Sequence, residues 1–311
     1  MRVFVFGDVH EGTSRFKQVE EQGARVWQWV IDVVEEYRCS MVFFLGDRFK
    51  SRDPEGVVRD RSDAGLLSLV KQVPVIAICG NHDFYYKSSN CCNYGILNDD
   101  VVRKLGLVVV ADSFEVEIGG RLIEFLSYNS KPRCKASWLF MHHEVEGLSK
   151  WATGLSKSEI AFYERIFSGH IHARIEYLNV QYIGVPFQQS FQDLEPCGGL
   201  VLDIVTGQMQ WIDFPGRVRF IVLDDLSNVN DLTNCVVRTT KPELYERMLE
   251  LGALHVEVVW KDEIALSRGS AVVVEKLNWD EVIREYLEVK GKGGEQDYFD
   301  FAKGVVKEVM R

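Results

Sequence analysis

Six of the seven histidines fall in short polar clusters, and each cluster directly follows an apolar run. The five clusters are Gly7-Asp8-Val9-His10, Gly46-Asp47, Gly80-Asn81-His82-Asp83, His142-His143 and Gly169-His170-Ile171-His172. Any one of them alone is typical of a turn, a helix cap or a structural histidine. Because ligands bind beyond the carboxyl ends of strands in open α/β sheets, five such strand ends can converge on one site.

The side chains in these clusters share the chemistry of metal ligands. Carboxylate, amide and imidazole donors, without thiolates, suit manganese, iron or zinc better than calcium or magnesium. A carboxylate can bridge two such cations and hold them about 4 Å apart. A cation pair lowers the pKa of a bound water, positions it for in-line attack and neutralises charge on a phosphoryl group. The sequence therefore predicts a dinuclear metal site suited to phosphoester hydrolysis.

The elements that must position these clusters alternate between strand and helix. Apolar runs predict strands, and the spacing over residues 16–37 and near 66–70 predicts helices. The runs lie at residues 2–7, 41–45, 73–79 and 137–141. Two later hairpins, at 114–126 and 200–214, make the middle of the chain rich in β-structure. The expected fold class is α/β (α+β), with a two-sheet β-sandwich flanked by helices.

Pro215-Gly216 is the best boundary between domains. Residues 1–215 would form the catalytic domain, and residues 216–277 a small α+β domain with strands at 218–223, 235–239 and 255–260. Residues 278–311 would form a helical tail, because 279–289 and 298–310 both have helical patterns. The tail could pack on its own domain or dock on a partner, and the pattern leaves both open.

Composition limits the class of protein. The chain has 311 residues, of which 46% are hydrophobic and 26% charged, as in globular proteins. No apolar run is long enough to span a membrane, and the N-terminus has the pattern of a first strand. The seven cysteines lack C-x-x-C spacing, so reduced thiols and a cytoplasmic location are expected. A net charge of −10 argues against a general nucleic-acid-coating protein but leaves a nuclease possible.

The order D-x-H, G-D, G-N-H-D, H, G-H-x-H over residues 1 to about 215 resembles the calcineurin-like metallophosphoesterase superfamily. The resemblance implies two divalent metal ions, with Asp47 bridging them. One metal would be held by Asp8, His10, Asp47 and His172, and the other by Asp47, Asn81, His142 and His170. His82 would stay unligated and protonate the leaving oxygen, with Asp83 orienting its ring. The family pattern also favours His142 over His143 as the ligand.

Two branches of that superfamily compete for this sequence. Protein Ser/Thr phosphatases begin similarly, but Cys79 stands where they carry an arginine. The segment Tyr182–Pro186 (YIGVP) instead resembles SbcD-type DNA repair nucleases. That resemblance implies manganese, with iron or zinc as alternatives, a capping domain at 216–277, and a tail that docks on an SbcC-type coiled-coil ATPase. It also implies a homodimer.

The leading hypothesis is a DNA exonuclease/endonuclease subunit in recombination and repair. Arg48, Lys50, Arg52 and Tyr85 are candidate DNA contacts beside the metal motifs. Lys50 stands where the nuclease family often has a histidine, which puts cleavage efficiency in question. The alternatives are a small-substrate phosphodiesterase or nucleotidase, or a protein phosphatase.

Overall fold

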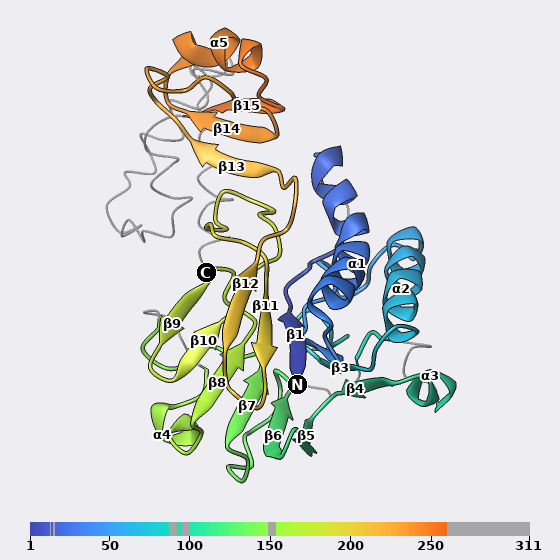
Figure 1. The fold of residues 1–311 in the computed structure, drawn as a ribbon. Coiled ribbons are helices and arrows are strands. Elements are labelled where there is room, and N and C mark those ends of the chain that lie inside the picture. Colours follow the sequence, from blue (N-terminus) through green and yellow to red (C-terminus); the bar gives the residue numbers. More distant parts are fainter. Residues whose placement is uncertain (13, 15, 87–91, 95–99, 149–153, 260–311) are drawn as a thin grey trace, which may run out of the picture. The chain divides into compact units, whose positions relative to one another are not determined.

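Two mixed sheets of six strands each pack face to face in the structure (Figure 1). The structure, a computed structural model, describes residues 1–259 except 13, 15, 87–91, 95–99 and 149–153. The chain divides into two compact units, Met1–Val258 and Val259–Arg311, and the first unit contains both sheets. The tail helices predicted at 279–289 and 298–310 lie outside the described residues.

The first sheet has four parallel strands and, on one side, two strands that pair antiparallel. Its order is β12 (Met209–Ile212), β11 (Gly199–Asp203), β1 (Arg2–Phe6), β2 (Met41–Phe44), β3 (Val75–Ile78) and β4 (Leu107–Val110). Strands β1 to β4 pair in parallel, whereas β11 runs antiparallel to both β1 and β12. Helix α1 (Lys17–Tyr37) connects β1 to β2, and α2 (Gly56–Val70) connects β2 to β3.

The second sheet also has four parallel strands, but with an antiparallel strand at each edge. Its order is β5 (Ser113–Ile118), β6 (Arg121–Leu126), β7 (Trp138–Met141), β8 (Arg165–Ser168), β10 (Val180–Tyr182) and β9 (Ile175–Tyr177). Strands β6, β7, β8 and β10 pair in parallel, and the outer strands are antiparallel. The β5–β6 turn uses Gly119 and Gly120 at φ values of 61° and 78°, as a two-residue hairpin turn requires. Two short helices, α3 (Asp100–Lys104) and α4 (Lys157–Ile160), lie in connections.

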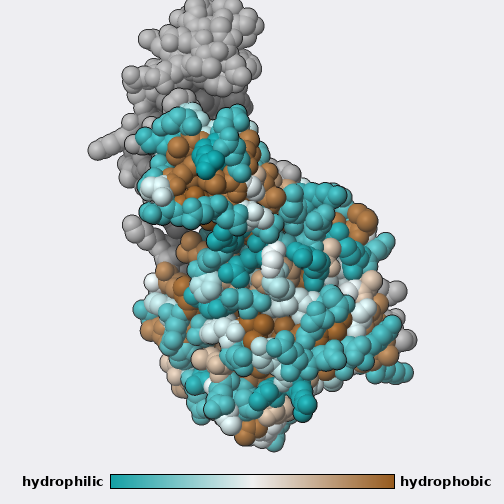
Figure 2. Space-filling model, turned by 45° about the horizontal axis from the view of Figure 1, so that its top comes forward, coloured by the Kyte–Doolittle hydropathy of each residue, from teal (hydrophilic) through white to brown (hydrophobic). Residues whose placement is uncertain are grey.

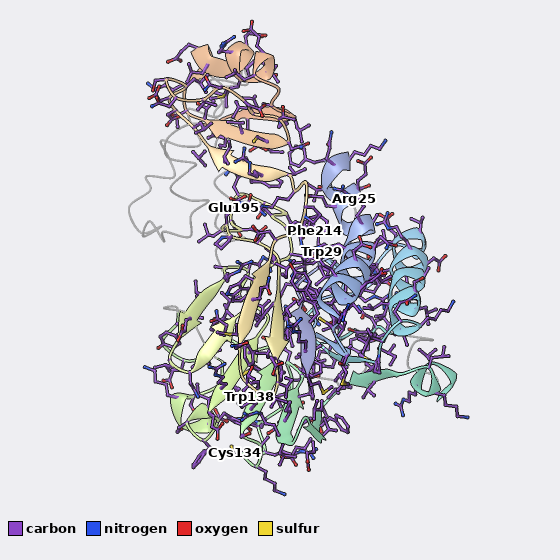
Figure 3. All side chains as sticks on the ribbon, viewed as in Figure 1. Arg25, Trp29, Cys134, Trp138, Glu195 and Phe214 are labelled. Carbon is purple, nitrogen blue, oxygen red and sulfur yellow. The ribbon has the colours of Figure 1, made fainter. Side chains whose placement is uncertain are left out.

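Alternation along the strands divides the core into layers. In β1, Phe4 and Phe6 pack against the helices, while Val3 and Val5 point into the space between the sheets. Successive strand residues point to opposite faces, so a strand covered on both sides is apolar throughout. This is why the runs that precede the polar clusters are continuously apolar. Trp29 of α1 packs edge-on against Phe214 at 5.2 Å, and Arg25 lies over the same ring at 5.8 Å (Figure 3).

A three-stranded parallel sheet follows Pro215-Gly216. It consists of β13 (Arg219–Val222), β14 (Cys235–Thr239) and β15 (His255–Val258), with a 3₁₀ turn at Pro242–Leu244 and α5 (Tyr245–Glu250) between the last two. One face of this sheet forms a small core with α5, which includes Val237, Met248 and Val256. The three strands predicted in this region are confirmed, whereas the domain boundaries at 215 and 277 stay predictions.

The predicted α/β fold with two sheets is confirmed. Among the described residues, no helix has the length and apolar character needed to cross a membrane. The face of the molecule in Figure 2 is mostly hydrophilic, with hydrophobic side chains in separate patches. Such scattered apolar surface is ordinary for a globular protein.

Candidate metal centre

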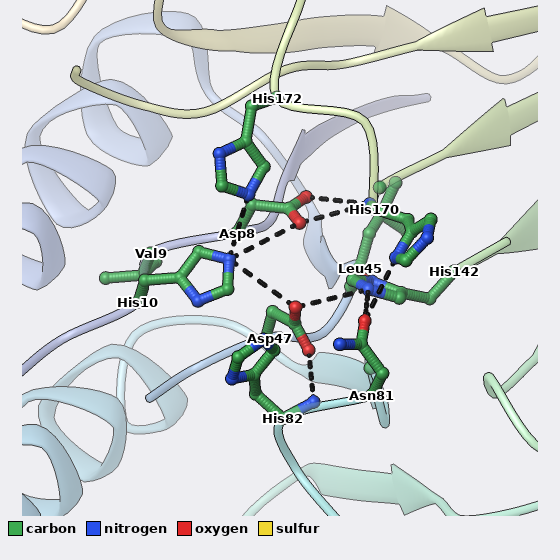
Figure 4. A network of polar contacts seen from close by, with 12 residues as sticks. Asp8, Val9, His10, Leu45, Asp47, Asn81, His82, His142, His170 and His172 are labelled. Atoms are coloured by element: carbon green, nitrogen blue, oxygen red, sulfur yellow. Dashed lines mark hydrogen bonds and ion pairs between the residues drawn. The ribbon is translucent and has the colours of Figure 1, made fainter. Parts of the chain in front are cut away.

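The carboxyl ends of five strands bring the predicted metal ligands to one place. Strands β1, β2 and β3 of the first sheet and β7 and β8 of the second all end there. The side chains that meet are those of Asp8, His10, Asp47, Asn81, His142, His170 and His172 (Figure 4). Both sheets therefore contribute to the site, and neither sheet alone would complete it.

Asp47 lies at the centre of this group. Its Oδ2 is 3.4 Å from Nε2 of His10 and also 3.4 Å from Nε2 of His142, which belong to different sheets. Its other oxygen accepts the backbone N–H of His82 at 2.8 Å. One carboxylate oxygen equidistant from two imidazoles occupies the position that a bridging ligand needs.

The remaining donors form two sets on either side of Asp47. In the first, Nε2 of His10 lies 3.1 Å from Nε2 of His172 and 3.9 Å from Oδ1 of Asp8. In the second, Oδ1 of Asn81 lies 3.2 Å from Nε2 of His142 and 3.0 Å from Nδ1 of His170. The division matches the two ligand sets implied by the sequence resemblance, although the assignment of each ligand to a metal stays a prediction.

The spacing of these atoms fits divalent cations. Ligand atoms about 2.1 Å from one ion are about 3 to 4 Å apart, depending on the angle between them. The separations given above for the two sets, 3.0 to 3.9 Å, lie in this range. Donor atoms of Asp8, His10 and His172, and likewise those of Asp8, Asp47 and His142, lie within 4.8 Å of one another. Mixed nitrogen and oxygen donors of this kind suit transition metals. The residues present therefore fit a dimetal site.

Burial sets the protonation of the histidines. Loss of solvent lowers the pKa of His10 and of His170 to about 3, so both rings are neutral at pH 7 and have a lone pair to offer. Burial would also lower the pKa of His142, but Asp47 and Asp8 beside it raise this pKa to about 9. Metal binding would displace that proton, since an imidazole must be deprotonated to coordinate.

Four of the predicted metal ligands have a strained, left-handed backbone conformation. Asp8, His10, Asp47 and His170 all have positive φ values, between 46° and 74°. Residues other than glycine avoid this region, so such outliers concentrate at functional sites. Gly169 allows the close approach, because a Cβ there would lie 2.7 Å from Oδ2 of Asp8.

The orientation of His82 differs from the expectation. Its Nδ1 lies 2.8 Å from the backbone carbonyl oxygen of Lys50, and its ring meets that of His10 edge-on at 4.9 Å. The buried carboxylate of Asp83 instead accepts the backbone N–H groups of Asp47, Arg48 and Gly80 at 2.7, 3.0 and 2.9 Å. Asp83 thus ties together the loops after β2 and β3, and a backbone carbonyl orients the His82 ring.

His142 and His143 are clearly separated by the structure. His142 reaches the metal centre, with Nδ1 lying 2.6 Å from the carbonyl oxygen of Leu45. His143 is buried elsewhere, with Nε2 at 3.0 Å from the carbonyl oxygen of Ser127 and its ring stacked on Tyr128. Adjacent residues of an extended chain point in opposite directions, which explains the separation.

A cavity of about 320 Å³ opens at the metal centre. Lys50 lines it together with Gln189, Ser190 and Gln192, whereas the lining that the structure describes includes neither Arg52 nor Tyr85. Arg52 donates a hydrogen bond to the carbonyl oxygen of Phe84 at 3.0 Å. Of the predicted DNA contacts, Lys50 is therefore the one that the structure places at the site.

Arg48 lies in the protein interior rather than at the site. Its side chain is fully buried, pairs with Asp63, donates to Oγ of Ser62 at 2.9 Å and lies over the ring of Phe49 at 4.4 Å. The sequence pattern could not reveal this, because a charged residue between two metal motifs looks the same whether it faces solvent or the core.

Arg48→Ala is expected to lower the free energy of unfolding by about 3 kcal/mol, since it leaves Asp63 without its partner. Urea denaturation measures this loss. The control Arg59→Ala removes a more exposed ion pair with Asp53 and should cost below about 1 kcal/mol. A stable Arg48→Ala protein with a raised KM would instead indicate contact with substrate.

Two residues near the metal centre were not predicted from the sequence. Asp193 is buried and lies 2.6 Å from Nδ1 of His172, and Gln189 donates to the carbonyl oxygen of Val9 at 2.8 Å. Both follow the YIGVP segment, whose sequence indicates the family but not the role of the residues after it. An acidic residue in a polar loop carries no sign of its partner until the fold is known.

Comparisons with known proteins identify the family of this chain. The calcineurin-like phosphoesterase family matches residues 1–174. Exonuclease subunit 1 of Enterobacteria phage T4 is 24% identical over 257 residues, covering 74% of this chain and 73% of that protein. A dimetal phosphatase from Danio rerio has a TM-score of 0.44 at 12% identity, covering 67% of this chain and 94% of that one. More than half of the chain matches the family, and the chain belongs to the calcineurin-like phosphoesterases.

Proposed function

We propose that this protein is a metal-dependent DNA exonuclease/endonuclease subunit. The observation that carries the proposal is its likeness to a phage exonuclease subunit, which spans 74% of the chain and so extends beyond the 174 residues of the family match. The cluster of carboxylate, amide and imidazole donors around Asp47 would hold two cations and so supports phosphodiester hydrolysis as the chemistry. The mixed nitrogen and oxygen donors suit manganese, iron or zinc. Among these we expect manganese, because the sequence resembles the SbcD-type nucleases.

The protein side of the mechanism follows from the site geometry. Asp8, His10 and His172 would hold one cation and Asn81, His142 and His170 the other, with Asp47 shared. A bound cation pair would supply an activated water and neutralise charge at phosphorus. His82 has Nδ1 fixed by the Lys50 carbonyl, so its Nε2 is the atom available to protonate the leaving oxygen.

Incubation of the purified protein with Mn²⁺ and either single- or double-stranded DNA tests the proposal. We expect degradation by the wild type and none by Asp8→Ala, whose carboxylate lies in the metal centre. Equal, background-level products from both proteins, with and without an SbcC-type ATPase, would refute the nuclease function.

Lys50→Ala is expected to raise KM for DNA without changing kcat. Lys50 lines the cavity and is exposed, so it can contact a phosphate without joining the bond-making step. Loss of one phosphate contact should reduce the slope of log affinity against log salt by about 1. The control Lys71→Ala removes an exposed lysine at the end of α2 and should leave both quantities unchanged. A fall in kcat alone would exclude this role.

One observation favours a small-substrate phosphodiesterase or nucleotidase instead. In the described part of the chain, Lys50 is the single lysine or arginine that lines the cavity, although a DNA-binding groove usually carries several. Turnover of bis-p-nitrophenyl phosphate and cyclic nucleotides, measured beside DNA, distinguishes the two. Efficient turnover of the small substrates with DNA left intact would favour the alternative.

The proposed assembly extends beyond the metal centre. We propose that residues 1–215 form the catalytic domain, 216–277 a capping domain over DNA, and 278–311 a segment that docks on an SbcC-type ATPase, within a homodimer. Size-exclusion chromatography with light scattering tests both associations. A monomer that does not co-elute with the ATPase would exclude this arrangement.

A further inference from the structure

The side chain of His172 is more exposed than those of His10 and His142, two other predicted metal ligands. Its side chain keeps 36% of its surface exposed, whereas those of His10 and His142 keep 6% and 0%. Packing alone therefore restrains the His172 ring less than the others. Its Nε2 nevertheless points into the centre, 3.1 Å from Nε2 of His10. A polar partner on the opposite side of the ring is needed to explain this orientation.

Asp193 is that partner. Its Oδ1 lies 2.6 Å from Nδ1 of His172, so a proton on Nδ1 is donated to the carboxylate and Nε2 is left with its lone pair. Its Oδ2 accepts the backbone N–H groups of Gln189 and Ser190 at 2.8 and 2.9 Å, and the Ser190 hydroxyl at 3.2 Å. The side chain of Asp193 is only 3% exposed. Both carboxylate oxygens of Asp193 therefore accept hydrogen bonds, and Oδ1 accepts the one from His172.

The loop that carries Asp193 is attached to the three-stranded sheet. Gln188, which is buried, donates from Nε2 to the Asp193 carbonyl oxygen at 2.6 Å and accepts the backbone N–H of Phe220 at 2.9 Å. Phe191 meets the Phe220 ring edge-on at 5.2 Å, and the guanidinium of Arg238 lies 4.0 Å from the Phe191 ring. Residues of β13 and β14 therefore hold this loop through contacts with Gln188 and Phe191.

We propose that Asp193 is a positioning residue that fixes the His172 imidazole for metal binding, on a loop anchored by the three-stranded sheet. The inference rests on the proposed ligand role of His172, but it does not depend on whether the substrate is DNA. A carboxylate behind a ligating imidazole both selects its tautomer and increases its basicity. Asp193 touches neither metal nor substrate in this role and acts through His172.

Asp193→Asn is the sharpest variant, because the volume is kept while one acceptor becomes a donor. The NH₂ group of the new amide then faces either the N–H groups of Gln189 and Ser190 or the N–H of His172, and two donors cannot form a hydrogen bond with each other. Titration calorimetry of the full chain with Mn²⁺ should show a loss of about 10- to 100-fold in affinity at one of two sites. The spin-coupled Mn²⁺ pair signal in electron paramagnetic resonance should weaken at a metal concentration that saturates the wild type.

Two further variants distinguish positioning from general damage. Asp213→Asn alters an exposed carboxylate paired with Arg174 at 3.7 Å and should bind Mn²⁺ as the wild type does. Gln188→Met removes the anchor without touching the Asp193 carboxylate and should give a smaller loss of affinity than Asp193→Asn. It also keeps the proposal testable if Asp193→Asn does not fold, as judged by circular dichroism.

Wild-type Mn²⁺ affinity at both sites in folded Asp193→Asn would overturn the positioning role. Wild-type affinity in Gln188→Met would overturn the anchoring by the three-stranded sheet. Excess Mn²⁺ should restore hydrolysis of bis-p-nitrophenyl phosphate by Asp193→Asn, which damage to the fold would not allow. None of these measurements contains DNA, so a failure of the proposed nuclease function would leave their outcome unchanged.

Discussion

Asp47→Asn should abolish phosphodiester hydrolysis, with a loss of at least about 1,000-fold in kcat/KM. Removing one preorganised electrostatic group typically costs about 100- to 1,000-fold. Asp47 should exceed this, because its Oδ2 lies 3.4 Å from both His10 and His142 and serves both halves of the centre. Steady-state kinetics with bis-p-nitrophenyl phosphate at several Mn²⁺ concentrations measure the effect.

The metal dependence of thermal stability provides a second measurement for Asp47→Asn. A ligand that binds only the folded state raises the melting temperature, so Mn²⁺ should stabilise the wild type. The variant should show little of this shift, because both cation positions lose their shared ligand. Asp60→Asn, an exposed aspartate on α2, should keep the full shift and full activity. A variant with normal stabilisation by Mn²⁺ would disprove the bridging role.

His82→Gln should lower kcat on DNA by about 100- to 10,000-fold while leaving two bound metals. The imidazole is oriented by the Lys50 carbonyl with Nε2 available, which is the arrangement of a proton donor. The loss should be much smaller with bis-p-nitrophenyl phosphate, because nitrophenolate leaves without protonation. Comparing kcat for the two substrates therefore isolates proton donation from other effects.

Metal analysis of His82→Gln tests the alternative that His82 is a metal ligand. Donor atoms of His10, Asp47 and His82 lie within 4.8 Å of one another, so these three side chains could also hold a cation. A drop in metal content, or an equal loss on both substrates, would make His82 a ligand rather than an acid. His255→Gln, which alters an exposed histidine on β15, should match the wild type in every respect.

The sequence predicted most of the fold because each signal was local. Apolar runs gave β1, β2, β3 and β7, and helical spacing gave α1. The ligand clusters were recognised for the same reason, since each directly follows a strand and the ends of parallel strands meet at one edge. A hairpin with two glycines was equally readable, because its turn geometry requires positive φ.

The residues that the sequence misjudged all depend on distant partners. Arg48 looks like a surface cation in the sequence, yet the fold places it against Asp63 and Phe49 in the interior. Asp83 was expected to orient His82, and the structure gives it three backbone N–H groups instead. A side chain in a loop has no periodicity to reveal its direction, so its partner emerges only when the chain is folded.

The sequence by itself determined the family, the α/β architecture and which side chains could bind metal. These follow from residue types and from spacing within a few positions. The tertiary structure alone decided that Asp47 lies equally close to His10 and His142, that Lys50 orients His82 through its carbonyl oxygen, and that Asp193 holds His172. Each of these depends on distances between residues that are far apart in the sequence, and the contact of Asp47 with His142 depends in addition on how the two sheets pack.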